Sequence, residues 1–374
     1  VWMCFSLSAQ KIIDLSGKWS FSIDRQDNGE KEKWFSHTLN DFINLPGSMP
    51  EKLKGDEVTA KTQWTGSLYD SSYYYNPYME KYRKEGNIKF PFFLTPDKHY
   101  VGAAWYQKEV NIPADWKGER ILLFLERPHI ETTVWVNGQK TGMQNSLCVP
   151  HQYDITHYVR PGKCTITIRV DNRIKEINVG PDSHSITDQT QGNWNGIVGR
   201  ICLQTTPKTY FDDIQIYPEP EQKLARVKVV IKGTGTAKVK LSAESFNTDK
   251  KHIVPAIQQE IKLNKGVTET EMVLPMGNDM LLWDEFHPAL YKLKAEVTNG
   301  KKTEIKEIQF GMRRFEIKGK WFYVNGRKTQ LRGTVENCDF PLTGYAPMDV
   351  ESWERVFRIC RSYGLNHMRF HSFC

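Results

Sequence analysis

The sequence lacks the signatures of several protein classes. After the first ten residues, no stretch holds the roughly 18 apolar residues that a membrane span needs. No basic block or nucleic-acid-binding motif is present, and Lys and Arg are interleaved with Asp and Glu. The net charge of +7 therefore indicates a solvated surface and no nucleic-acid partner. The composition is that of a globular protein, and 374 residues predict two or three domains.

The cysteines show neither an even count nor a paired spacing. The seven residues are Cys4, Cys148, Cys164, Cys202, Cys338, Cys360 and Cys374. No two of them stand in C-x-x-C spacing, so neither a zinc site nor a disulfide framework is indicated. One chance disulfide would be compatible with this pattern, but we expect structural free thiols. The sequence implies no cofactor and leaves open whether a metal ion assists a site.

The first ten residues, VWMCFSLSAQ, are apolar and then small. They look like the tail of a secretory signal with cleavage near Ala9 or Gln10, although a basic start is missing. The alternative is an ordinary N-terminal strand. We expect the signal remnant at residues 1–10, and with it a periplasmic or extracellular protein.

Residues 11–206 carry the pattern of a β-sandwich. Ile166, Ile168 and Val170 alternate with polar residues, which predicts a strand with one buried face. The continuous apolar run 121–125 predicts a central strand. Asn137-Gly138 follows a short apolar run and predicts a hairpin turn, because both turn positions need a positive φ.

A second β region follows over residues 207–314. Its first part, residues 207–220, contains three prolines and is interpreted as a connector. Apolar residues then alternate with Lys and Glu over 237–241 and 291–297. This spacing predicts a smaller sandwich, immunoglobulin-like in size.

The pattern changes over residues 315–374. A hairpin is expected around Asn325-Gly326, with strands at 321–324 and 329–331. Asp349 can then cap a helix with an apolar stripe, and Gly364 can end it. Strands at about 331–336 and 365–371 flank that helix, and strand–helix–strand is the unit of a parallel α/β sheet.

Residues 62–100 form a tyrosine-rich insertion. Its tyrosines are Tyr69, Tyr73, Tyr74, Tyr75, Tyr78, Tyr82 and Tyr100. Two interpretations stay open: a loop that reaches toward a ligand, and a loop that packs down on its own rings.

Several stretches, taken in order, resemble glycoside hydrolase family 2, which includes β-galactosidases, β-glucuronidases and β-mannosidases. The resemblance covers about residues 11–374. The stretches are AAWYQKEVNIP, VWVNGQKTG, DITHYVRPGK, NWNGIVGRI, LLWDEFHPALYKLKAEV, FEIKGKWFYVNGRKTQLRGTVE and YGLNHMRFH.

The resemblance implies a mainly β fold in three parts. A jelly-roll, galactose-binding-like β-sandwich is followed by an immunoglobulin-like sandwich and by the first βαβ part of a truncated (β/α)8 TIM barrel. It also implies a retaining β-glycosidase, β-galactosidase-like, that acts on a glycan or oligosaccharide in carbohydrate metabolism. Members are often dimers or larger, which implies a homo-oligomer of the full-length form.

The resemblance also implies that the family's two catalytic glutamates come from later barrel strands, beyond Cys374. The family motifs assign neither role to Glu336, which lies near the end of the first barrel strand. The chain as given is therefore expected to be inactive. The alternative class is a non-catalytic carbohydrate-binding or structural module that uses the two sandwiches alone, which would have no use for a βαβ unit.

Alternation along 365–371 predicts that Met368 and Phe370 face outward, and that His367, Arg369 and His371 face the barrel interior. For His367, a packed interior histidine is the preferred interpretation. Arg369 and His371 lie at the catalytic end and are predicted to bind substrate. Many members read Arg-x-Ser-His here; in this chain the histidine comes one place early, which could turn it to the other face.

Three further residues are candidates for substrate binding. Arg332 is predicted to face the barrel interior. Asp339 lies in a loop that is often His-rich in the family's galactosidases, and it is either a sugar contact or an unengaged loop residue. Asp188 precedes NWNGIVG, where relatives place an aspartate that reaches the barrel site. The matching position is nearer Thr190, and a loop-capping role is the alternative for Asp188.

Overall fold

The computed structural model describes residues 11–59, 61–66, 75–88, 95–175, 183, 186–188, 192–264, 266–337 and 339–371. The chain forms two compact units. The larger unit comprises Ile12–Gln204 and Gly333–Cys374, and the smaller comprises Val1–Lys11 and Thr205–Arg332. Several predictions lie outside the described residues. They concern the signal remnant at residues 1–10, Tyr69, Tyr73, Tyr74, Cys4, Cys338 and Cys374.

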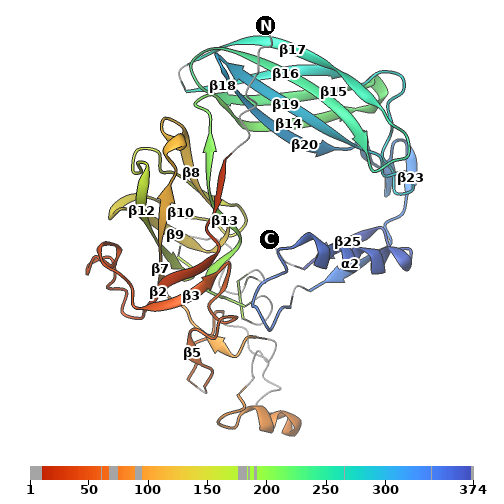
Figure 1. The fold of residues 1–374 in the computed structure, drawn as a ribbon. Coiled ribbons are helices and arrows are strands. Elements are labelled where there is room, and N and C mark those ends of the chain that lie inside the picture. The colour runs from red at the N-terminus through yellow and green to blue at the C-terminus, as the bar shows by residue number, and fades with distance from the viewer. Residues whose placement is uncertain are drawn as a thin grey trace. The chain divides into compact units, whose positions relative to one another are not determined.

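Two antiparallel sheets build the sandwich of the larger unit (Figure 1). One runs in the order β1 (Ile12–Asp14), β13 (Gly196–Thr206), β8 (Arg120–His129), β11 (His151–Asp154), with β4 (Gly47–Ser48) paired to β13. The other runs in the order β10 (Gln139–Asn145), β9 (Glu131–Val136), β12 (Gly162–Asp171), β7 (Ala103–Ile112), β2 (Gly17–Asp24), β3 (Asp41–Leu45).

Short elements complete this part of the chain. They are β5 (Asp56–Glu57), which pairs with β6 (Lys98–His99), and the 3₁₀ turns η1 (Trp34–Ser36), η2 (Pro77–Tyr82) and η3 (Ala114–Trp116). In the described part of the tyrosine-rich insertion, Tyr75 and Tyr78 are exposed whereas Tyr100 is buried. The described tyrosines therefore do not form one packed cluster.

The predictions for β8 and for the β9–β10 hairpin are confirmed. The apolar run 121–125 lies in β8, between β13 and β11. Asn137 and Gly138 join β9 to β10 with φ values of 51° and 78°. The sandwich core lies between the two sheets, and its largest members include Trp19, Phe21 and Tyr106.

The predicted buried face of β12 is confirmed, since Ile166, Ile168 and Val170 are fully buried, and the opposite face is covered as well. Thr167 is only 1% exposed and Arg169 only 7%. The Gln107 amide donates to Thr167 Oγ1, and the Arg169 guanidinium pairs with Asp27 and Asp171. A second apolar cluster covers this outer side of the sheet; it contains Trp34, Phe35, Leu39, Trp105 and Trp135. Polar residues thus enter the interior because partners satisfy them.

The smaller unit is a second sandwich. Its three-stranded sheet has the order β14 (Tyr210–Glu219), β15 (Leu224–Lys232), β18 (Val267–Pro275), and η4 (Pro220–Gln222) joins the first two strands. Its four-stranded sheet has the order β17 (Ile253–Leu263), β16 (Gly235–Phe246), β19 (Leu290–Asn299), β20 (Lys302–Phe310). The predicted alternation is confirmed, since Ala237, Val239, Leu241 and the apolar residues of β19 line its core.

The proposed connector at residues 207–220 is corrected, because most of it is strand β14. Pro218 lies within that strand, opposite Ala225. A strand proline is tolerated here because β14 is an edge strand that pairs with β15 alone in its sheet.

The smaller unit ends in a three-stranded sheet of β21 (Phe315–Lys318), β22 (Trp321–Val324) and β23 (Arg327–Thr329). Asn325 and Gly326 form the predicted turn, with φ values of 51° and 75°. The strand after the turn begins at Arg327, two residues earlier than expected.

The chain returns to the larger unit as a βαβ unit, which confirms the predicted order. The strands β24 (Gly333–Glu336) and β25 (His367–Phe370) are parallel, and α2 (Val350–Ser362) connects them. Asp349 caps α2 by accepting from Ser352 N, and Gly364 has a φ of 76°. Along the expected apolar stripe, Trp353, Val356 and Cys360 are half-buried, whereas Val350 and Phe357 are exposed.

The described cysteines agree with the expectation of free thiols. Cys148, Cys164, Cys202 and Cys360 are all unbridged. In the part of the chain that the structure describes, no helix is both long and apolar enough to cross a membrane.

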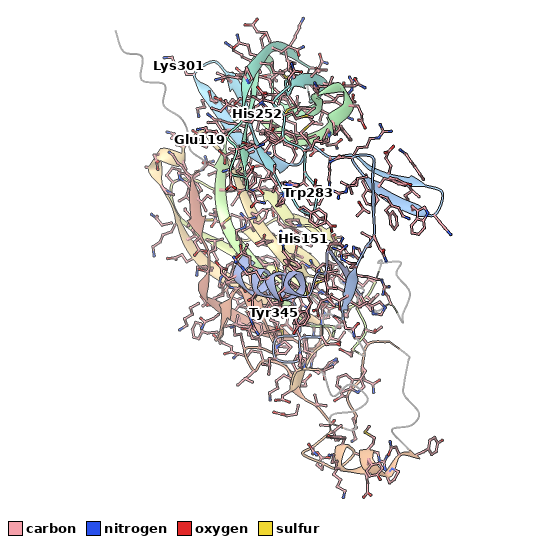
Figure 2. The ribbon with its side chains drawn as sticks, turned by 90° about the vertical axis from the view of Figure 1, so that its right-hand side faces the viewer. Glu119, His151, His252, Trp283, Lys301 and Tyr345 are labelled. Atoms are coloured by element: carbon pink, nitrogen blue, oxygen red, sulfur yellow. The ribbon has the colours of Figure 1, made fainter. Side chains whose placement is uncertain are left out.

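Because two histidines of the larger unit are buried, we expect the free energy of unfolding of this unit to fall at acidic pH. Burial lowers the pKa of His129 to about 3 and that of His151 to about 4 (Figure 2 labels His151). An unfolded histidine titrates near about 6.5, so stability is fully present above that pH and falls as the pH drops toward the folded values. Each residue costs up to about 1.4 kcal/mol per pH unit in this window.

We therefore expect urea unfolding of the larger unit to shift to lower urea between pH 6.5 and 4.5. His151→Gln should reduce that shift, because one titrating group is gone. The exposed His157→Gln is the matched control and should change nothing. An unfolding midpoint that does not move over this pH range would contradict the prediction.

Candidate functional site

The candidate site lies at the edge where the two parallel strands end. β24 ends at Glu336 and β25 at Phe370, and Glu336 is paired with Phe370 in register. Just past the strands, His371 N donates to Glu336 O over 2.8 Å. The carboxyl ends of β24 and β25 therefore meet, and residues 337–349 leave this edge as a loop toward α2.

Asp339 in this loop is influenced by Glu336. Partial desolvation and the nearby Glu336 charge together raise the pKa of Asp339 above its usual range. The structure thus brings together Glu336, Asp339 and the backbone of His371. A pair of adjacent carboxyls can accept hydrogen bonds from several sugar hydroxyls, because ionised carboxylates are acceptors only.

Strand β25 presents different residues to its two faces. The Phe370 ring lies edge-on to Trp353 of α2, with 5.5 Å between the ring centroids. This face therefore meets the helix, as expected for an outward-facing residue. Arg369 is exposed and lies on the opposite face, because strand residues alternate. His371 follows the end of β25 and is half-buried.

Arg332, which was predicted to face the barrel interior, lies outside the strands of the βαβ unit. It precedes β24, which begins at Gly333, and it belongs to the smaller unit. Its guanidinium forms an ion pair with Glu285 over 3.2 Å. Alternation from β24 therefore does not assign Arg332 a barrel-facing direction.

Asp188 holds loops of the sandwich together. It is 4% exposed, and its carboxylate accepts from Thr65 N over 2.6 Å and from Asn193 N over 3.0 Å. His99 Nε2 lies 3.2 Å from the same carboxylate. These contacts fit the loop-capping alternative. Thr190, the other position considered, lies outside the described residues.

The loop at residues 339–349 is anchored to the sandwich by residues that sequence reasoning missed. Tyr345 Oη donates to Glu51 Oε2 over 2.9 Å, and its ring lies 5.5 Å from that of Trp194. Ser48 Oγ donates to Thr343 O over 2.5 Å. Burial and the charge of Glu51 raise the pKa of the Tyr345 hydroxyl. The partners are almost 300 residues apart in the chain, so local patterns carry no signal of them.

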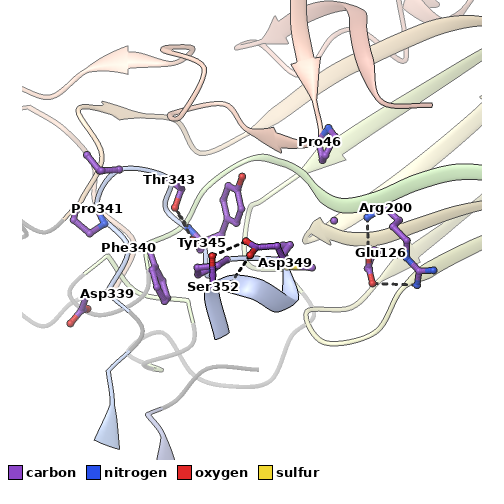
Figure 3. A pocket seen from close by; sticks show the side chains of 14 residues that line it. Pro46, Glu126, Arg200, Asp339, Phe340, Pro341, Thr343, Tyr345, Asp349 and Ser352 are labelled. Atoms are coloured by element: carbon purple, nitrogen blue, oxygen red, sulfur yellow. Dashed lines mark hydrogen bonds and ion pairs between the residues drawn. The ribbon is translucent and has the colours of Figure 1, made fainter. Parts of the chain in front are cut away.

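A groove of about 730 Å³ lies between this loop and the sandwich (Figure 3). We call it the loop groove. From the sandwich, Pro46, Glu126, Gly199 and Arg200 line it, and the loop supplies most of the remaining wall. Arg200 Nε and N both donate to Glu126 Oε2, over 3.2 and 2.7 Å.

The described residues at this edge do not form a metal centre. Among the described residues, no group of three or more His, Cys, Asp or Glu side chains is placed to hold a metal ion. The described arrangement is suited to hydrogen bonding and to apolar contact.

Tyr345→Phe should loosen the loop without unfolding the sandwich. The variant keeps the ring on Trp194 but removes the donor to Glu51, which should cost about 1 kcal/mol. Amide hydrogen exchange at residues 340–347 should accelerate, measured by mass spectrometry. Tyr217→Phe, which removes an exposed hydroxyl bonded to Gln215, is the control and should leave the loop unchanged. Equal exchange in wild type and Tyr345→Phe would show that the anchor does not restrain the loop.

Two family models match the chain. The model "Glycosyl hydrolases family 2, sugar binding domain" matches residues 12–207, and "Glycosyl hydrolases family 2" matches residues 209–313.

Curated relatives are glycoside hydrolases. A β-galactosidase of Thermoanaerobacter pseudethanolicus is 24% identical over 76% of this chain and 38% of its own length. A putative β-glucuronidase of Formosa agariphila is 28% identical over 74% of this chain and 33% of its own length. The matched part is thus about a third of either relative.

Solved structures share the fold. A β-glucuronidase from Ruminococcus gnavus in complex with D-glucuronic acid has a TM-score of 0.67, at 19% identity over 96% of this chain and 56% of that one. With a sugar-binding-domain match that covers more than half of its residues, the chain belongs to glycosyl hydrolases family 2.

Proposed function

We propose that this chain forms the scaffold and part of the substrate-binding wall of a retaining β-glycosidase that hydrolyses O-glycosidic bonds of β-linked sugars. One observation carries the proposal. The two sandwiches are followed by a parallel βαβ unit, and Asp339, Arg369 and His371 lie at or just past the C-terminal ends of its strands. In parallel α/β folds this edge is where ligands bind.

The βαβ unit is, in this proposal, the beginning of a (β/α)8 barrel, and the smaller sandwich is immunoglobulin-like. Asp339 accepts hydrogen bonds from sugar hydroxyls, and Arg369 donates to sugar oxygens. His371 forms a further part of the substrate-binding wall. The relatives are named both β-galactosidases and β-glucuronidases, so an acidic sugar is as good a candidate as a neutral one. Arg369 would suit a uronate, because a guanidinium can bind a carboxylate through two hydrogen bonds.

A retaining mechanism needs a carboxylic acid and a carboxylate nucleophile about 5–5.5 Å apart on either side of the scissile bond. In the proposed enzyme both come from barrel strands later than β24 and β25. The chain's own residues bind and orient the sugar. We further propose that the whole protein is exported, works as a homo-oligomer and serves carbohydrate metabolism.

The 374-residue chain should therefore show no turnover on aryl β-glycosides. A longer form that carries the later strands should hydrolyse them with retention at the anomeric carbon, which proton NMR of the first-formed sugar reports. If the 374-residue chain hydrolyses these substrates and Glu336→Gln abolishes the activity, catalysis belongs to Glu336 and the assignment to later strands is wrong. A longer form that binds glycans but hydrolyses none of a broad panel would favour the binding-module alternative.

Asp339→Asn in the active form should raise KM about tenfold or more, because a charged hydrogen bond to a sugar hydroxyl is worth about 1.5–3 kcal/mol. Substrate binding should weaken as the pH falls through the raised pKa of Asp339, since protonation removes acceptor capacity. The Asp339→Asn variant should not show this weakening of substrate binding at low pH, because its side chain does not titrate. Asp249→Asn, at an exposed position of the smaller unit, is the control. An unchanged KM and pH profile in Asp339→Asn would remove Asp339 from the substrate site.

A further inference from the structure

The last part of the smaller unit carries a concentration of positive charge. Residues 313–332 contain seven Lys or Arg residues and a single acidic residue, Glu316, and thus have a net charge of +6. The whole chain has a net charge of +7, so acidic and basic residues nearly balance elsewhere. The small sheet of β21, β22 and β23 lies within this segment and gathers several of its cations.

The register of this sheet divides its side chains into two chemically different faces. Residues directly opposite each other in an antiparallel pair share a face, and successive residues of a strand alternate between faces. Phe315 and Ile317 share one face with Phe322, so this face is apolar. The other face, which we call the lysine–aromatic face, carries Glu316, Lys318, Trp321, Tyr323 and Lys328.

Lysine side chains lie against the rings of the lysine–aromatic face. Lys328 Nζ is 3.2 Å from the centroid of the Trp321 ring, and Lys318 Nζ is 5.3 Å from that of Tyr323. Lys320, in the turn between β21 and β22, lies 5.5 Å from the Trp321 ring. Trp321 itself is 41% exposed, so the indole and the surrounding ammonium groups are open to solvent together.

Two of these ammonium groups have no carboxylate to neutralise them. Lys318 pairs with Glu316 over 3.2 Å, whereas Lys320 and Lys328 form no ion pair with any described residue. The cation–π contact of an exposed lysine is weak compared with a hydrogen-bonded ion pair. Lys328 can therefore exchange its contact with the Trp321 ring for the carboxylate of an incoming ligand.

The mixture of groups on this face fits an acidic sugar polymer. A pyranose ring has an apolar C–H surface that can lie on an exposed indole. Carboxylates beside that sugar can then accept hydrogen bonds from lysine ammonium groups. Glu316 lies opposite Tyr323 on the same face, and its side chain is 17% exposed. Its carboxylate can accept from sugar hydroxyls but would repel the phosphates of a nucleic acid.

We propose that the lysine–aromatic face binds an acidic polysaccharide chain, with one uronate unit on Trp321 and neighbouring carboxylates on Lys320 and Lys328. This face belongs to the smaller unit, whereas β24 and β25 of the candidate site belong to the larger one. The inference goes beyond the proposed function, because holding a polymer requires no hydrolysis.

The test uses the 374-residue chain and a hexameric oligogalacturonide as the probe, with binding measured by isothermal titration calorimetry at low salt. The probe should bind. Maltohexaose, a neutral hexamer, should bind about tenfold more weakly or not at all, because it has no carboxylates. Binding of the probe should weaken as the salt concentration rises, since the lysines are exposed and their charges are screened.

Variants on the two faces of the sheet locate the binding. Trp321→Ala should weaken probe binding about tenfold, because it removes the stacking surface. Lys328→Gln should weaken binding about threefold, a typical effect of one exposed charge pair, and should reduce its salt dependence. Ile317→Ser, on the apolar face, and Lys250→Gln, at an exposed position of the smaller unit, are the matched controls and should bind normally. If Trp321→Ala does not fold, Lys328→Gln and Lys320→Gln carry the test.

Three results would overturn the inference. The first is probe binding that is absent, or equal in wild type, Trp321→Ala and Lys328→Gln. The second is tighter binding of single-stranded oligothymidylate than of the probe, because the face would then recognise nucleic acid. The third is binding that Arg369→Gln abolishes and Trp321→Ala leaves intact, because the polymer would then occupy the candidate site.

The same measurements separate this inference from the proposed function. A longer form that hydrolyses no glycoside, while Trp321-dependent binding of the oligogalacturonide persists, would defeat only the proposed glycosidase. Hydrolysis of aryl glycosides by a longer form whose polymer binding does not depend on Trp321 would defeat only the role of the lysine–aromatic face.

Discussion

The contact that the candidate site depends on is the one between Tyr345 and the sandwich. The hydroxyl donates to Glu51, and the ring packs near Trp194, which itself stacks on His129. Ser48 adds a bond to the backbone of Thr343. These contacts fix the middle of the segment that runs from Asp339 to the cap of α2 and lines the loop groove. The βαβ unit therefore shares one compact unit with the sandwich.

Behind this anchor is a buried network of amides that organises the sandwich loops. Asn195 accepts from the Tyr106 hydroxyl and donates to the backbone of Gly102 and Val170. Asn172 donates to Tyr100 O, and Asn193 donates to Asn172 O. The stretch NWNGIVG, which contributed to the family resemblance, is thus a structural motif here. Its two asparagines satisfy loop backbones, and Trp194 between them meets Tyr345.

The strands, turns and helix caps could be predicted because they depend on neighbours in sequence. Alternation placed the core faces of β16 and β19, and Asn-Gly placed two hairpins through its positive φ. Asp349 and Gly364 bounded α2 through local hydrogen bonding and backbone conformation. Where the local pattern failed, a distant partner was responsible. By alternation alone Arg169 would face solvent, but it is buried because it pairs with Asp27 and Asp171. Proline usually interrupts a strand, but Pro218 is tolerated because β14 is an edge strand.

By itself, the sequence determined the order of the β regions, the strand–helix–strand unit after them and the family to which that order belongs. It also placed Arg369 on the face opposite Phe370, since a strand's period is local. Only the tertiary structure decided the setting of the candidate residues. It put Asp339 beside Glu336, buried Asp188 among loop amides, and built the groove between segments nearly 300 residues apart. The reason is physical: burial, charge proximity and cavity shape arise from contacts between distant segments, which no local pattern encodes.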